Sequence, residues 1–139
     1  MGRKILAVVA EPVSGEALKK SVGSERAQAA EVLVVAPALS SRTRFVFSDP
    51  DPAIDRAEEV HQETVERMEE EGIDAAGDTG EADPLLAIQD ALTTFPADEI
   101  VLFTHPGGER NWLEEGVVQE AKARFQVPVH HLLVESGRT

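Results

Sequence analysis

Short apolar runs alternate with longer stretches of helical periodicity along the 139 residues of the chain. Continuous runs of Val, Ile and Leu are typical of strands that are buried on both faces of a parallel sheet. The sequence predicts five strands, at residues 5–10, 32–36, 73–77, 99–104 and 127–134, the third being the weakest. Because strands that alternate with helices favour right-handed crossovers, we expect an α/β fold with a doubly wound parallel sheet.

Helix-start signals stand between these strands. A capping residue, often followed by proline in the first turn, marks such a start. The signals are Ser14, Asp51 with Pro52, Asp83 with Pro84, and Asn111 with Glu114, an Asn variant of the capping box. The first helix is expected to run to Ala30, although Gly23 lowers helix propensity in its middle. No internal repeat divides the chain, so we expect a single domain over residues 1–139.

The composition excludes several classes of protein. The absence of cysteine excludes a disulfide scaffold, an iron–sulfur cluster and a cysteine nucleophile. The formal net charge is -13 and no basic patch is visible, so we expect no binding to nucleic acid. No apolar run reaches the roughly 18 residues that cross a bilayer, so we expect neither membrane insertion nor export. A cytoplasmic protein is the resulting expectation.

The histidines do not form a predicted metal site. His130 and His131 are neighbours in the fifth strand, so their side chains should point to opposite faces of the sheet. His61 belongs to a helix, far in the sequence from His105. Residues 51–83 hold half of the acidic residues, which we interpret as a solvated helix face. We therefore expect no bound metal.

A ligand site is expected beyond the carboxyl ends of the strands, where the strand order of an open parallel sheet reverses. The candidate ligand-binding residues in the loops there are Ala10, Glu11, Ser14, Ala36, His105, Gly107, Gly108, Arg110 and Asn111. The Gly107-Gly108 pair leads into a helix start, where backbone N–H groups and the Arg110 guanidinium can hold an anion. Alternatively, the glycines only permit the turn and Asn111 caps the helix.

Signatures of catalysis are absent from the sequence. There is no GxSxG elbow, no GxxxxGK[ST] loop and no GxGxxG after the first strand. His105 can titrate near neutrality, so it is interpreted either as a proton donor or as a histidine bonded to loop backbone. Ser14 has a capping role, which weakens its pairing with Glu11 and His105 as a nucleophile with its base. We expect no catalytic residues.

The chain ends with a predicted strand, loop, helix and strand, EIVLFTHPGGERNWLEEGVVQEAKARFQVPVHHLLV. This segment resembles the universal stress protein family, and the resemblance extends over almost the full chain. Family members that bind ATP carry GxxG, nine residues, and then Gly followed by Ser or Thr after the fourth strand. In this chain the four motif positions fall on Phe103, Pro106, Gly116 and Val117, of which Gly116 alone matches.

These departures have physical consequences for ATP binding. Phe103 adds bulk where the backbone approaches a phosphate, Pro106 has no N–H donor, and Val117 has no hydroxyl. The family also places an Asp near the end of the first strand to contact adenine, and Ala10 occupies that position beside Glu11. The resemblance therefore implies a divergent member that is independent of ATP.

The resemblance also implies a sheet in the order 3-2-1-4-5 with four helices, and a homodimer built by antiparallel pairing of the fifth strands. The fifth strand is long and apolar for a sheet edge, which proteins usually cover or pair. The expected interface residues are Val127, Val129, His130, His131, Leu132 and Leu133. Protonation of His130 or His131 near the dimer axis would weaken association at low pH.

We therefore expect a non-catalytic, homodimeric module without a cofactor, which senses a small ligand in the crevice between the first and fourth strands. A role in stress response comes from the resemblance alone. The alternative is an adenine-nucleotide binding protein that holds ATP, with magnesium, through a shifted phosphate loop at Gly107-Gly108.

Overall fold

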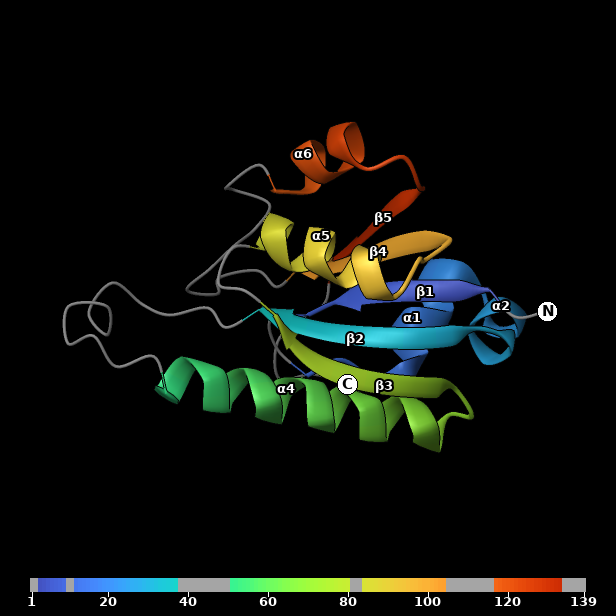
Figure 1. Ribbon diagram of the computed structural model, residues 1–139. Coiled ribbons are helices and arrows are strands. Elements are labelled where there is room, and N and C mark those ends of the chain that lie inside the picture. The colour runs from blue at the N-terminus through green and yellow to red at the C-terminus, as the bar shows by residue number, and fades with distance from the viewer. Residues whose placement is uncertain (1–2, 10–11, 38–50, 81–83, 105–116, 134–139) are drawn as a thin grey trace.

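The computed structural model describes residues 3–9, 12–37, 51–80, 84–104 and 117–133. These residues form one five-stranded sheet in the order β3-β2-β1-β4-β5, with helices on both of its faces (Figure 1). All four strand pairings are parallel. The predicted doubly wound α/β fold and its strand order are confirmed.

The elements alternate along the chain as the apolar pattern predicts. Their bounds are β1 Lys4–Val8, α1 Gly15–Val22, α2 Ser24–Ala29, β2 Glu31–Pro37, α4 Asp51–Glu70, β3 Asp74–Gly80, α5 Pro84–Thr94, β4 Glu99–Thr104, α6 Val117–Arg124 and β5 Val129–Leu133. The expected caps at Asp83 and Asn111 lie outside the described residues. No helix in the described part of the chain is long and apolar enough to span a membrane.

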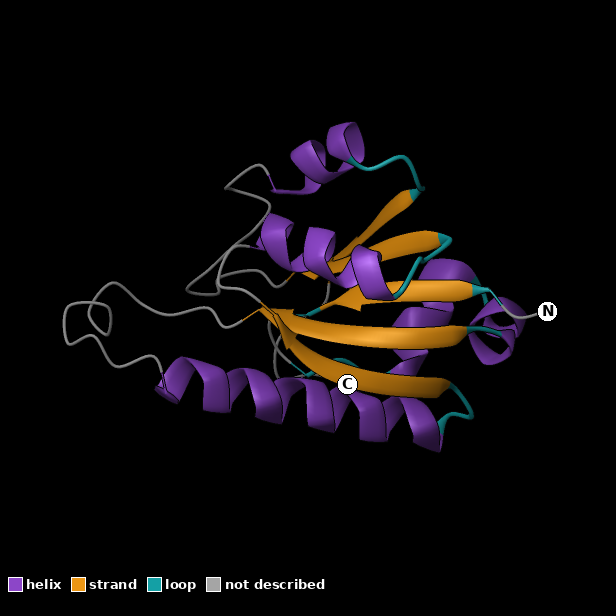
Figure 2. Ribbon diagram, viewed as in Figure 1, coloured by secondary structure: helices purple, strands orange, loops and turns teal. Residues whose placement is uncertain are grey.

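Two hydrophobic clusters lie on the two faces of the sheet, between the layers that Figure 2 distinguishes by colour. Ile5 and Ala7 of β1 pack in one cluster with side chains of α1, α2 and α4. Leu6 and Val8 pack in the other cluster with side chains of α5 and α6. Because successive side chains of a strand point to opposite faces, a strand covered on both faces reads as an unbroken apolar run.

The prediction of one continuous helix from Ser14 to Ala30 is wrong. The chain has two helices there, because Gly23 adopts φ 97° and separates α1 from α2. A positive φ carries no steric penalty for glycine. The Gly23 N–H donates to the Lys19 carbonyl oxygen at 2.7 Å, and this bond closes the end of α1.

The strand predicted at 73–77 is too short. β3 begins at Asp74 and extends to Gly80, and each of its residues is in register with one residue of β2. Gly77 and Asp78 have low strand propensity, which is why the apolar pattern fades there. Pairing with the buried strand β2 overrides that local preference.

Candidate functional site

The predicted crevice lies at the carboxyl ends of β1, β2 and β4, where β1 is flanked by β2 on one side and β4 on the other. Ser14 and Ala36 are described there, and Val117 is described as the first residue of α6. The other candidate ligand-binding residues lie outside the described residues: Ala10, Glu11, His105, Gly107, Gly108, Arg110, Asn111 and Gly116. These eight assignments stay predictions.

Hydrogen bonds to α4 and α1 hold Val13 and Ser14, the two residues before α1. The Ser14 hydroxyl accepts from the Ala17 N–H at 3.2 Å, so Ser14 caps α1 as predicted. The Val13 N–H donates to the hydroxyl of Thr64, a fully buried residue of α4, at 3.1 Å. Val13 and Ser14 are therefore held in place by α4 and α1, and the Ser14 hydroxyl already has a donor.

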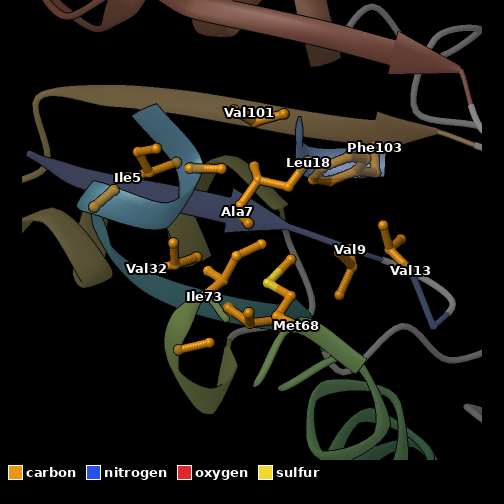
Figure 3. Close-up of a cluster of buried hydrophobic side chains, with 14 of the residues drawn as sticks. Ile5, Ala7, Val9, Val13, Leu18, Val32, Met68, Ile73, Val101 and Phe103 are labelled. Atoms are coloured by element: carbon orange, nitrogen blue, oxygen red, sulfur yellow. The ribbon is translucent and has the colours of Figure 1, made fainter. Parts of the chain in front are cut away.

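Phe103, which the sequence comparison aligned with the first position of the ATP motif, lies inside β4 and not in the loop after it, with 0% of its surface exposed. It belongs to the same cluster as Val13 and Leu18, and Figure 3 shows Leu18 beside its ring. The α1 side of β4 is thus filled with hydrocarbon at this position. The Phe103 side chain is therefore part of the hydrophobic core.

Ala36, the candidate from the second strand, is a core residue. Its side chain is 1% exposed and belongs to the cluster under α1 and α4. Its register partner in β3 is Thr79, whose buried hydroxyl has no hydrogen-bond partner among the described residues. Thr79 was not a candidate from the sequence, because the predicted third strand ended at residue 77 and did not include it.

The predicted self-association strand, β5, is at the edge of the sheet. In β1, by contrast, every residue after Lys4 is buried. The described side chains of the expected interface are all half-buried: Val127, Val129, His130, His131 and Leu132. The side chain of Leu133 lies outside the described residues. Among the described residues, an edge strand with half-buried side chains is thus in place at this end of the sheet.

A cluster of charged groups, which no motif in the sequence indicates, lies where β4 begins. Glu99 is 1% exposed, and its Oε1 lies 2.9 Å from Nε2 of His130. Its Oε2 accepts from Nη2 of Arg26 at 2.5 Å and from Nε of Arg3 at 3.3 Å. We call Arg3, Arg26, Glu99 and His130 the Glu99 cluster. A buried carboxylate is tolerated when it is paired and hydrogen-bonded in this way.

The two histidines of β5 lie on opposite faces of the sheet, as predicted. His130 is in register with Val101 and His131 with Leu102, and these two partners belong to different hydrophobic clusters. Burial, and secondarily the charge of Lys122 on α6, lower the pKa of His131 below 6.5. Within the described ranges, no group of three His, Asp or Glu side chains is arranged to hold a metal ion.

Comparison with solved structures identifies the fold. A universal stress protein from Archaeoglobus fulgidus matches 94% of this chain and 98% of its own, with a TM-score of 0.66 and 20% sequence identity. The chain has the universal stress protein fold. A universal stress protein family protein from Arabidopsis thaliana, with AMP bound, matches 96% of this chain and 93% of its own, with a TM-score of 0.64 and 12% identity.

The universal stress protein fold confirms the family resemblance at the level of architecture. No family model matches the sequence, and no curated protein is significantly similar to it. The chain therefore shares its fold with these two structures at only 20% and 12% sequence identity.

Proposed function

We propose that this chain is a non-catalytic universal-stress-protein-like module that self-associates through β5 and binds a small ligand between β1 and β4 without requiring ATP. The observation that carries the proposal is the complete burial of Phe103, which the sequence resemblance aligns with the first glycine of the ATP motif. Two further departures from the motif agree with it, since Pro106 has no N–H and Val117 has no hydroxyl to donate to a phosphate. We also propose a role in stress response in the cytoplasm, and this part of the proposal rests on the family resemblance.

Charge also disfavours ATP as the ligand. The formal net charge of the chain is -13, whereas ATP carries about four negative charges near neutrality. The repulsive field would have to be offset locally, within about one Debye length of 8 Å at physiological salt. A neutral or weakly charged small molecule meets a smaller barrier.

The proposed partner in self-association is a second copy of the chain. β5 is an edge strand with half-buried side chains, and such an edge readily pairs with another strand. Antiparallel pairing of two β5 strands about a twofold axis is self-complementary, because each copy offers the other the same groups. This pairing extends the sheet across both copies.

A proline substitution at the outer edge of β5 tests the homodimer. The Ile100 N–H donates to the Pro128 carbonyl oxygen, and alternate residues of a parallel strand face the same neighbour, so the N–H of His131 faces away from β4. His131→Pro removes this outer donor without removing a bond to β4. We expect its dimer dissociation constant, measured by sedimentation equilibrium, to rise by about tenfold or more.

His131→Val is the matched control, because it removes the imidazole but keeps the N–H. It should dimerise like the wild type. A monomeric wild type, or a His131→Pro variant that dimerises as tightly as His131→Val, would contradict pairing through β5.

The second candidate function is adenine-nucleotide binding, which the AMP in the Arabidopsis structure favours. In this candidate the Gly107-Gly108 pair, Arg110 and the following helix start hold the phosphates. Calorimetric titration with ATP and magnesium tests it. Saturable binding that is lost in Arg110→Ala would favour this candidate over the ATP-independent module.

A further inference from the structure

We propose that Glu99 is a positioning residue for self-association: its buried carboxylate, through His130, holds β5 where its outer edge meets a second copy. The inference rests on the homodimer proposed above. The new element is that the Glu99 carboxylate of each copy holds that copy's own β5 in place.

The contact between His130 and Glu99 joins the surface of the molecule to its interior. The His130 side chain is 38% exposed on β5, whereas the Glu99 side chain is 1% exposed at the start of β4. The distance between Nε2 and Oε1 is 2.9 Å, which is a normal hydrogen-bond length. An edge strand has a neighbour on one side only, so this bond adds a side-chain constraint to the backbone pairing with β4.

The donors around Glu99 determine which ring nitrogen of His130 carries the hydrogen in its contact with Glu99. Nη2 of Arg26 and Nε of Arg3 both donate to Oε2, while His130 contacts Oε1. A carboxylate paired with two guanidinium groups is an acceptor, so Nε2 of His130 must be the donor.

Loss of the His130 donor should affect association more than folding. Arg3 and Arg26 would still neutralise Glu99, so the buried carboxylate would keep two of its partners. The lost bond is the one that reaches β5. Because pairing of two edge strands requires both to lie at ladder distance along their length, a displaced β5 weakens the interface directly.

The test compares two substitutions that differ in hydrogen bonding. The side chain of His130→Gln can donate an amide N–H to Glu99, whereas that of His130→Leu fills a similar volume without a donor. We expect the dimer dissociation constant of His130→Leu to rise about tenfold and that of His130→Gln to stay within about threefold of the wild type. At protein concentrations below the dimer dissociation constant, urea unfolding should give similar midpoints for the two variants.

The remaining outcomes separate this inference from the homodimer itself. A dimeric wild type with an unchanged constant in His130→Leu would overturn the role of Glu99 and leave the homodimer standing, whereas a monomeric wild type would overturn both. If His130→Leu does not fold, His130→Asn replaces it, because its shorter amide does not reach Glu99. A His130→Asn variant that dimerises as tightly as His130→Gln would also overturn the inference.

Discussion

At the scale of single residues, His61 of α4 packs against the backbone of Gly77 in β3. A Cβ atom at position 77 would lie 2.4 Å from Nδ1 of His61, so a glycine is required for this close approach. Nδ1 is buried and has no hydrogen-bond partner among the described residues. Burial lowers the pKa of His61 below 6.5, although the charges of Asp78 and Glu58 oppose the shift.

His61 should make the protein less stable in acid. Because its folded-state pKa is below 6.5, the unfolded chain binds a proton at a higher pH than the folded protein does. The stabilisation by neutral His61 is complete above pH 6.5 and is lost as the pH falls through the folded-state pKa. Urea unfolding at about pH 8 and about pH 5 should show a larger loss for the wild type than for His61→Asn, which does not titrate. Equal losses in the two proteins would contradict this account of His61.

Gly77→Ala should destabilise the protein by about 1–3 kcal/mol, because the added methyl group displaces the imidazole of His61. Gly77 does not have a positive φ, so the cost comes from contact and not from backbone strain. A double-mutant cycle with His61→Ala checks the cause by urea unfolding. The cost of Gly77→Ala should fall by more than half in the His61→Ala background, and an unchanged cost would locate the strain elsewhere.

At the scale of elements, the sequence predicts a strand well where both of its faces are buried. β1, β2 and β4 follow from apolar runs, because such runs have few alternatives to a covered parallel strand. β3 was predicted too short, since its last residues depend on pairing with β2 and not on their own propensity. At Gly23 the sequence predicted only a lowered helix propensity and not the end of a helix. Glycine occurs both inside helices, at some cost in stability, and at their ends, so its presence alone does not distinguish the two.

The cap at Ser14 gives a prediction at this scale. Ser14→Ala removes the acceptor for the Ala17 N–H and should lower the free energy of unfolding by about 1 kcal/mol. Ser24→Ala is the control, because Ser24 is exposed and α2 has no side-chain cap. Its effect should stay within about 0.5 kcal/mol. Urea unfolding that gives equal effects for the two substitutions would contradict a capping role for Ser14.

At the scale of the whole molecule, the architecture was more predictable than the site. Strand order and layers follow from repeated apolar patterns along the chain, so errors in one element leave the fold unchanged. The Glu99 cluster joins residues that are up to 127 positions apart, between Arg3 and His130, and no local pattern predicts such a meeting. Phe103 was assigned to the motif frame from the sequence, but its burial with Val13 and Leu18 depends on how α1 packs on β4.

Native mass spectrometry of protein purified without added nucleotide, and again after addition of ATP with magnesium, tests the central claim most directly. One spectrum reports both self-association and any bound ligand. We predict a species of twice the chain mass without a retained adenine nucleotide, and an unchanged spectrum after ATP is added. A dimer that retains an adenine nucleotide would contradict the account, because it would mean that the phosphates are held despite Phe103, Pro106 and Val117.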